Sequence, residues 1–193
     1  MTSKTSTQAS TKTTPPAQPP ARPPFPVGKP TKVGDTTVTL NKGKTTSLRL
    51  VRFIKAPAER IYQAFLDPDA MAKWLPPHGF TGHVHSIDAR VGGSYRMSFS
   101  TINRSWGHTF GGVYKELVPG KRIVHTDKFE SDDPIMGGAE MTVTIDLKPV
   151  PGGTEVHVLQ EGIPAGPAAD GAPYGWSQSF ENLARLCEAE LPF

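Results

Sequence analysis

Residues 174–191 read YGWSQSFENLARLCEAEL, and this stretch decides the fold. Apolar side chains recur in it at intervals of three and four, the spacing of one helix face: Trp176, Phe180, Leu183, Ala184 and Cys187. At about 1.5 Å per residue, such a helix is about 25 Å long. We therefore expect a long amphipathic helix that covers an equally long apolar surface.

Residues 80–161 predict that surface as a series of antiparallel strands. Residues 94–101 (SYRMSFST) and 139–148 alternate between apolar and polar side chains, so that one face of each strand is apolar. Further strands are expected at 83–90, 108–118, 122–130 and 154–160, because turn residues rich in Gly and Pro separate them. Residues 162–173, rich in Gly, Pro and Ala, are expected to form a loop.

One more strand and two short helices are expected ahead of this sheet. Residues 46–54 (TSLRLVRFI) predict the strand. Pro57 and Glu59 suit the first turn of a helix that ends at Asp67-Pro68, and a second piece covers residues 69–75. The order β-α-α-β6-α predicts an α+β, helix-grip fold, in which a curved antiparallel sheet wraps around the C-terminal helix and leaves an internal cavity.

The first 45 residues differ in composition from the rest. They hold eight of the 20 prolines, and seven Lys and Arg against one acid give them a net charge of +6. Residues 46–193 carry 14 Lys and Arg against 17 acids, a net charge of −3. We expect residues 1–45 to be a disordered basic tail and residues 46–193 to be one domain. Deletion of residues 1–44 should then leave the melting temperature within a few degrees. Because the domain is acidic, no specific nucleic-acid binding is expected.

The compartment is predicted from what the sequence lacks. Cys187 is the single cysteine, so no internal disulfide can form, and we interpret it as a small core residue. No run of about 18 apolar residues and no apolar signal segment is present. A cytoplasmic protein without a membrane span is therefore expected, while its oligomeric state stays open.

Several runs of the sequence resemble a known superfamily. They are APAERIYQAFLDPDAMAKWLPPHGF, VGGSYRMSF, GGVYKELVPGKRIVHT, GGTEVHVLQEGIP and GWSQSFENLARL, in that order. Together they resemble the SRPBCC (START-like, Bet v 1-like) superfamily, and within it bacterial proteins similar to the C-terminal domain of the activator of heat-shock protein 90 ATPase. The resemblance covers about residues 47–191 and implies the helix-grip fold with its cavity. Members of the superfamily bind hydrophobic molecules, catalyse cyclisations or assist chaperones.

We expect the cavity to be lined by aromatic side chains, methionines and two histidines. The candidates for ligand binding are Trp74, Phe80, His85, Tyr95, Met97, Phe99, Phe110, His125, Met141, Trp176 and Phe180. Trp74 and Trp176 are placed at the cavity mouth. For most of these residues, a filled core is the competing interpretation.

The chain shows no recognisable catalytic dyad or triad, so no catalytic residue is assigned. His83 and His85 share one face of a strand, but two ligands do not make a metal site, and neither a metal nor another cofactor is expected. The leading hypothesis is therefore binding of a small hydrophobic molecule. The alternatives are a cyclase or aromatase that uses Tyr95, His85 and His125, and a chaperone ATPase modulator or other protein-interaction module.

Overall fold

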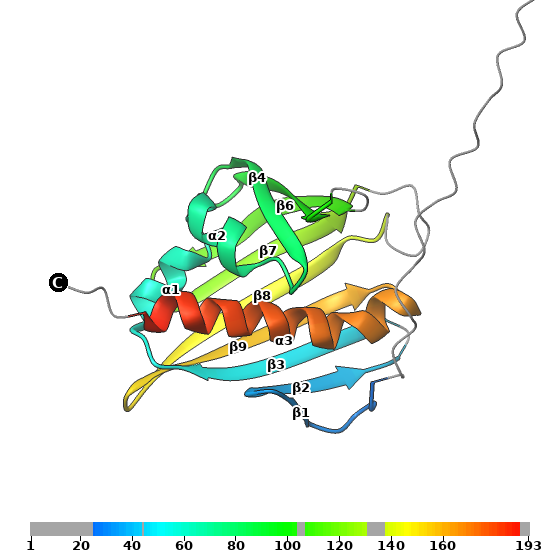
Figure 1. The fold of residues 1–193 in the computed structure, drawn as a ribbon, viewed down its shortest axis with the longest axis horizontal. Helices are drawn as coiled ribbons and strands as arrows, with labels where there is room; N and C mark the ends of the chain where they lie inside the picture. The colour runs from blue at the N-terminus through cyan, green and yellow to red at the C-terminus, as the bar shows by residue number, and fades with distance from the viewer. Residues whose placement is uncertain (1–24, 44, 104–106, 131–137, 190–193) are drawn as a thin grey trace, which may run out of the picture.

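The computed structural model describes residues 25–43, 45–103, 107–130 and 138–189. Within these ranges the chain forms nine strands and three helices (Figure 1). The strands are β1 (Thr31–Val33), β2 (Thr36–Asn41), β3 (Thr46–Ile54), β4 (Phe80–Ile87), β5 (Ser94–Thr101), β6 (Gly107–Val118), β7 (Arg122–Phe129), β8 (Met141–Val150) and β9 (Gly153–Ile163). The helices are α1 (Ala58–Ala64), α2 (Pro68–Trp74) and α3 (Pro167–Glu188).

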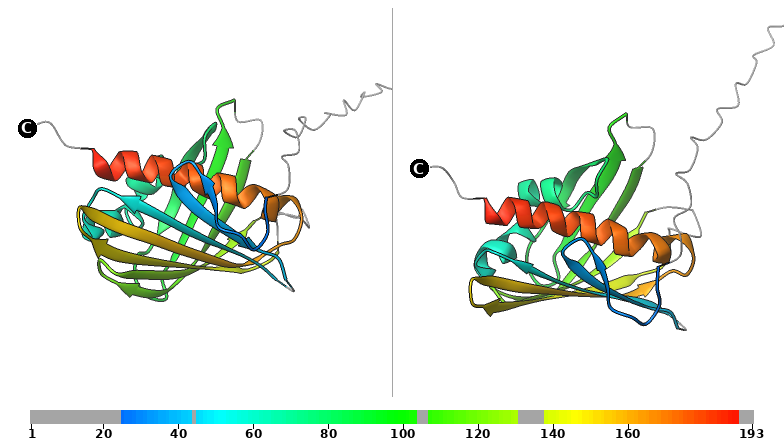
Figure 2. Two further views of the ribbon diagram at one scale, coloured as in Figure 1. Left: turned by 90° about the horizontal axis from the view of Figure 1, so that it is seen from below. Right: turned by 60° about the horizontal axis from the view of Figure 1, so that its bottom comes forward.

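All strands in the described residues join one antiparallel sheet in the order β1-β2-β3-β9-β8-β7-β6-β5-β4. The sheet curves around α3, which lies across one of its faces, here called the inner face (Figures 1 and 2). The helices α1 and α2 connect β3 to β4 and cover one end of that face (Figure 1). The predicted α+β helix-grip fold is confirmed.

The core lies between the inner face and α3. Strands β3, β8 and β9 bury every second residue, as the alternating sequence requires. From the helix, Phe180, Leu183, Ala184 and Cys187 are buried, which agrees with the predicted apolar face. The thiol of Cys187 is 1% exposed and its burial raises its pKa to about 11, so it behaves as a core side chain.

The described part of the predicted tail is folded. Residues 31–41 form the hairpin β1–β2, which adds to the edge of β3 and lies beside α3 (Figure 2). Val38 and Leu40 are fully buried, and Phe25 contacts the ring of Tyr174 on α3 at 5.7 Å between centroids. Folded residues therefore precede the predicted boundary at residue 45, and residues 1–24 lie outside the described residues.

The start of α3 also differs from the prediction. The helix begins at Pro167, inside the segment 162–173 for which the sequence predicts a loop. Proline is tolerated in the first turn of a helix, where its missing N–H has no partner to lose. Pro173 lies inside the helix, and its carbonyl accepts a hydrogen bond of 2.7 Å from the Ser177 hydroxyl.

Candidate functional site

Aromatic rings from neighbouring strands line the inner face of the sheet between β5 and β7. The ring of Phe110 lies 4.8 Å from that of Phe99 and 5.5 Å from that of Phe129, between centroids. Met97 is paired with Phe110 across the strands and is fully buried. These side chains form an apolar wall opposite α3.

A polar cluster of Tyr95, His125 and Asp127 lies beside this wall. The Tyr95 hydroxyl oxygen is 3.3 Å from His125 Nδ1, and the two rings are perpendicular with centroids 5.3 Å apart. Because His125 and Asp127 are two residues apart on β7, their side chains share one face. The Asp127 carboxyl accepts hydrogen bonds from the Tyr95 hydroxyl and from the backbone N–H of Lys128. We call these three residues the inner-face cluster.

Asp127 is the most unusual member of the inner-face cluster. Its side chain is buried, and its Oδ1 atom has no hydrogen-bond partner among the residues that the structure describes. Burial disfavours the charged carboxylate and raises its pKa to about 7, although the bonds from Tyr95 and Lys128 act in the opposite direction. Near neutral pH, this carboxyl group is therefore present in both the protonated and the ionised form.

His125 and Tyr95 are held in their neutral forms. Burial lowers the pKa of His125 to about 4 and outweighs the hydrogen bond to Thr126. His125 Nδ1 lies 2.9 Å from the Thr126 carbonyl oxygen, so the proton is assigned to Nδ1 and the acceptor lone pair to Nε2. Burial and then the charge of Asp127 raise the pKa of Tyr95 well above its usual value. The cluster thus offers neutral hydrogen-bonding groups in an apolar setting.

A second polar contact joins the sheet to α3. Trp176 Nε1 donates a hydrogen bond of 2.8 Å to Gln160 Oε1 on β9, and Gln160 Nε2 lies 3.3 Å from Met141 Sδ. Met141 pairs with Asp127 across β7 and β8, so this contact adjoins the inner-face cluster. Trp176 also contacts the ring of Phe180, at 5.6 Å between centroids.

Close backbone packing positions the inner-face cluster. A Cβ atom on Gly112, which lies opposite Tyr95 on β6, would stand 1.8 Å from the Thr126 carbonyl oxygen. Only glycine fits there, and the Val113 N–H donates a 3.0 Å hydrogen bond to the Thr126 hydroxyl. A β-bulge between Tyr114 and Glu116 shifts the β6–β7 register nearby.

Eight of the predicted cavity residues lie around this site and three do not form part of it. The eight are Tyr95, Met97, Phe99, Phe110, His125, Met141, Trp176 and Phe180. Trp74 is 1% exposed, contacts Phe65 and donates to the Ala64 carbonyl at 2.7 Å, so it belongs to the core between α1 and α2 rather than to a mouth. Phe80 is half-buried at the start of β4.

His85 lies on the opposite face of the sheet from the cluster. It is exposed, and its Nε2 atom is 3.0 Å from the Ser98 hydroxyl on β5. The inward positions of β4 are taken by half-buried residues such as Gly82 and Val84. His83 and His85 contact each other at 4.7 Å between ring centroids, but the described residues contain no group of three or more His, Cys, Asp or Glu that could hold a metal.

The sequence analysis missed Asp127, Phe129 and Gln160 as site residues, and Tyr114, whose ring lies 5.7 Å from that of Tyr95 between centroids. The alternation of residues along β7 could have identified Asp127. Every second residue of this strand faces inward, and these are Ile123, His125, Asp127 and Phe129. The alternation therefore places the Asp127 carboxyl group on the apolar face.

The inner-face cluster does not line either of two surface pockets formed by described residues. One lies between the β1–β2 hairpin and α3, and the other is formed by Lys55, Ala56, Pro57, Gly152 and Gly153. In the described part of the chain, no helix is long and apolar enough to cross a membrane.

The chain is similar to one family and to several solved structures. Residues 55–188 match the family described as Activator of Hsp90 ATPase homolog 1-like protein. Protein CV1439 from Chromobacterium violaceum is 46% identical, with 75% of this chain and 98% of that chain covered and a TM-score of 0.71. Protein MLL2253 from Mesorhizobium loti is 26% identical, with coverage of 75% and 99% and a TM-score of 0.61.

More distant structures share the fold alone. Protein Ms6760 from Mycobacterium smegmatis is 19% identical, with 80% of this chain and 99% of that chain covered and a TM-score of 0.64. No match is found among curated proteins.

Proposed function

Because the chain belongs to the family of Activator of Hsp90 ATPase homolog 1-like proteins, we propose that it binds a small, largely apolar molecule between the sheet and α3. In this proposal the polar end of the molecule contacts Tyr95, His125 and Asp127. The rest of it lies against the aromatic wall of Phe99, Phe110 and the neighbouring rings.

One observation carries the proposal: a buried carboxyl group with an unpartnered oxygen among the described residues, set among apolar side chains. A buried polar atom without a hydrogen bond costs about 1–3 kcal/mol, and an apolar residue at position 127 would avoid that cost. Binding of a ligand hydroxyl to Oδ1 would supply the missing partner. The carboxyl group therefore favours a ligand with one hydrogen-bonding group at the end of an apolar body.

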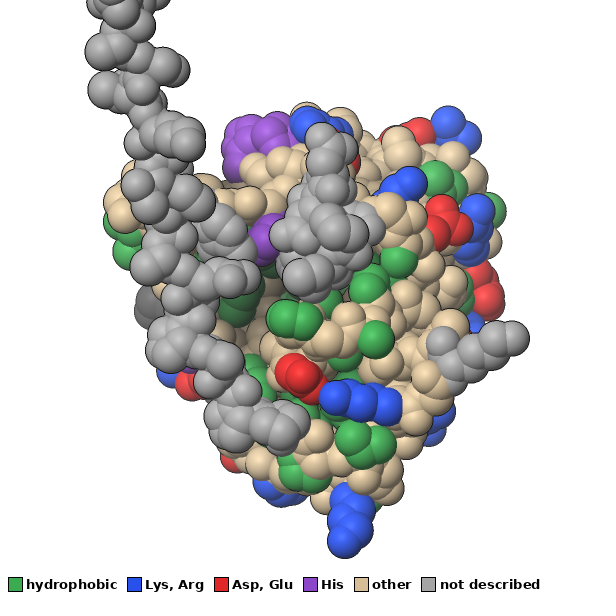
Figure 3. Space-filling view, turned by 90° about the vertical axis from the view of Figure 1, so that its right-hand side faces the viewer, with side chains coloured by type: hydrophobic (Ala, Val, Ile, Leu, Met, Phe, Trp, Pro, Cys, Tyr) green, Lys and Arg blue, Asp and Glu red, His purple; other side chains and the backbone are tan. Residues whose placement is uncertain are grey.

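The entrance is proposed at the end of the molecule where α3 begins. Trp176 lies near this end of α3 and is half-buried. Figure 3 views this end and shows hydrophobic side chains across the middle of the face, with one acidic and one basic side chain side by side among them. Lys42 and Asp170, in the first turn of α3, neutralise each other at 2.8 Å, so an apolar ligand would meet a paired charge there rather than a free one.

Paired aromatic probes test the proposal. We expect 2-naphthol, which carries one hydroxyl, to bind the full chain at least ~10-fold more tightly than naphthalene, because one hydrogen bond to a buried acceptor is worth about 1.4 kcal/mol. Isothermal titration calorimetry measures both. Asp127→Leu should remove the preference while it retains binding of naphthalene.

The two histidines provide a matched control for this experiment. His125→Phe changes the inner-face cluster, whereas His85→Phe changes the outer face of the sheet and should leave both affinities unaltered. Equal affinities of the wild-type chain for the two probes would contradict the role of the cluster, and no uptake of either probe would contradict the apolar site.

An enzyme acting in the same site is the second candidate. A carboxyl group whose pKa is about 7, hydrogen-bonded to a tyrosine hydroxyl, suits proton transfer at a carbon next to a carbonyl group. Turnover of such a substrate should fall by ~10²-fold or more in Asp127→Asn if the chain is a cyclase or related enzyme. A binding protein would show no turnover to lose.

The family description raises a third candidate, modulation of a chaperone ATPase. It is tested by adding the full chain to an Hsp90 ATPase assay. Stimulation that persists in Asp127→Leu would assign the function to a surface rather than to the inner-face cluster.

A further inference from the structure

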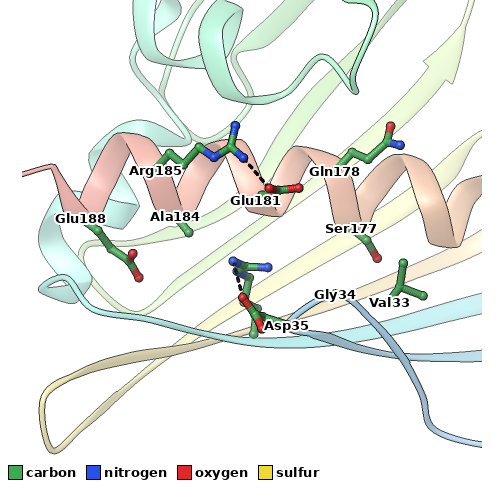
Figure 4. Close-up of a pocket in the computed structure, with 10 residues that line it drawn as sticks. Val33, Gly34, Asp35, Ser177, Gln178, Glu181, Ala184, Arg185 and Glu188 are labelled. Carbon is green, nitrogen blue, oxygen red and sulfur yellow. Dashed lines mark hydrogen bonds and ion pairs between the residues drawn. The ribbon is translucent and has the colours of Figure 1, made fainter.

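A second site lies partly outside the residues that match the family. An open pocket of about 350 Å³ lies between the β1–β2 turn and the side of α3 (Figure 4). This volume is at the lower end of the range for small-molecule sites, roughly 300–1,000 Å³. Val33, Gly34, Asp35 and Arg52 form one wall and precede residue 55, where the family match begins.

Arg52 is the central charged group of this pocket. It occupies an inward position of β3 between the fully buried Leu50 and Ile54, where an apolar residue is the usual choice. Its side chain is only 9% exposed, and its contacts to Asp35 Oδ2 and Thr36 Oγ1 are both long, at 3.4 Å. Its Nε atom has no partner among the described residues. Most of the five N–H donors of the guanidinium group are therefore poorly satisfied.

The contact with Asp35 is easily replaced. Asp35 stands on the turn of the hairpin with a side chain 87% exposed, so solvent screens its pairing with Arg52. A ligand carboxylate in the pocket can accept two parallel hydrogen bonds from a guanidinium group, which is a stronger arrangement. Arg52 thus predicts a carboxylate on the ligand.

The opposite wall adds negative charge. Glu181 and Glu188 line the pocket from α3, where Glu181 pairs with Arg185 and Figure 4 shows Glu188 directed toward the hairpin side. Glu188 Oε1 accepts a 2.8 Å hydrogen bond from the Lys55 backbone N–H, which leaves its second oxygen for a ligand. Three carboxylates against Arg52 and Arg185 give the lining a net charge of −1, which disfavours a multiply charged anion such as phosphate.

We propose that this pocket binds a small zwitterion, a free amino acid or a similar amino carboxylate. The carboxylate of the ligand pairs with Arg52, and its ammonium group lies beside the Glu188 carboxylate of α3. Ala184, whose small side chain points into the pocket in Figure 4, leaves room for the carbon chain. This site is independent of the inner-face cluster.

Titration of the full chain with three kinds of probe tests the proposal. The zwitterions are glycine, L-alanine and 4-aminobutanoate, the carboxylate without an amine is propionate, and the amine without a carboxylate is propylamine. Saturation-transfer NMR should show saturable binding of at least one zwitterion below about 10 mM, and at least ~10-fold weaker binding of both singly charged probes. Binding of no zwitterion, or equal binding of propionate or propylamine, would overturn the proposal.

Substitutions then assign the groups. Arg52→Gln should weaken zwitterion binding at least ~10-fold, whereas Arg49→Gln, on the exposed face of the same strand, should not. Because Arg52 is buried, its replacement also affects stability, so Glu188→Gln is used as a second variant. Glu188 is exposed, and the glutamine amide keeps a hydrogen-bond acceptor for the Lys55 N–H but loses the negative charge. Its matched control is the exposed Glu161→Gln. If Glu188→Gln binds the zwitterion as tightly as the wild type does, the proposed ammonium site is wrong.

Discussion

Replacement of Asp127 by Asn tests the buried carboxyl group through the pH dependence of stability. The pKa of this group rises from an ordinary 3.8 to about 7 in the folded chain, mainly because of burial. At 1.36 kcal/mol per pKa unit, the difference corresponds to a loss of stability of about 4 kcal/mol when the group is ionised in both states. Water that enters the folded site would reduce this figure, so it is an upper estimate.

The direction of the effect follows from proton binding. Below about pH 4 both states are protonated and Asp127 contributes no pH dependence. Between about pH 4 and pH 7 the unfolded chain releases the proton and the folded chain keeps it, so stability falls as the pH rises, by up to about 1.4 kcal/mol per pH unit. Above about pH 7 both states are ionised and the loss is complete. The amide side chain introduced by Asp127→Asn never ionises, so the variant escapes this loss.

Urea unfolding of the wild type and of Asp127→Asn, followed by circular dichroism between pH 4.5 and pH 8, measures the effect. The stability of the variant relative to the wild type should increase across this range and level off above about pH 7.5. His125 titrates in both chains, so its contribution cancels in the difference. A difference that is constant with pH would show that Asp127 ionises as freely in the folded chain as in the unfolded one, and would refute the buried polar cluster.

Three further variants test the fold around the two sites by urea unfolding. Leu40→Ala should lower the free energy of unfolding by about 2–5 kcal/mol, because this side chain is fully buried on β2. Asn41 is exposed, so Asn41→Ala should change it little. Equal, small effects of the two variants would support the prediction that this segment is disordered. Gly112→Ala should cost at least about 1–3 kcal/mol, since its Cβ would meet a backbone oxygen that cannot rotate away, and wild-type stability would mean that β6 and β7 separate easily. Phe180→Ala should cost about 3–5 kcal/mol, and a variant that unfolds like the wild type would place that face of α3 outside the core.

The fold could be predicted from the sequence because its signals are periodic. The strand at 46–54 and the strand at 94–101 have the predicted bounds, since alternation over eight or nine residues leaves little ambiguity. The errors arose where the prediction relied on amino-acid composition rather than on the periodicity of apolar residues. Residues 36–40 (TTVTL) do alternate, with Val38 and Leu40 inward, but prolines and lysines around them led to a disordered prediction. Likewise, Gly and Pro in residues 162–173 concealed the first turns of α3.

The site was harder to predict than the fold, because it depends on which face of each strand is turned inward. On β5, the apolar candidates all lie on one face, so that face is predicted to point inward. On β4, His83 and His85 lie on one face and Phe80, Gly82 and Val84 on the other, so neither face is clearly apolar. A β-bulge between Val84 and Ser86 makes its register irregular as well. Asp127 was overlooked because an acidic residue is rarely fully buried, so a carboxylate in a strand is normally assigned to solvent.

The β1–β2 hairpin, which precedes the family match, supplies the part of the second site that the matched residues lack. Without the hairpin, β3 would be an edge strand, with unpaired backbone groups and with Leu48 and Leu50 uncovered at the rim of the core. Pairing with β2 removes that edge, and β1, at three residues, leaves only a short new one. Protection of an edge requires neither a buried arginine nor a pocket, because an apolar residue at position 52 would close the contact between the hairpin and α3 more stably. Burial of the Arg52 charge costs free energy that the fold does not require. We therefore attribute Arg52 to the binding of a charged ligand.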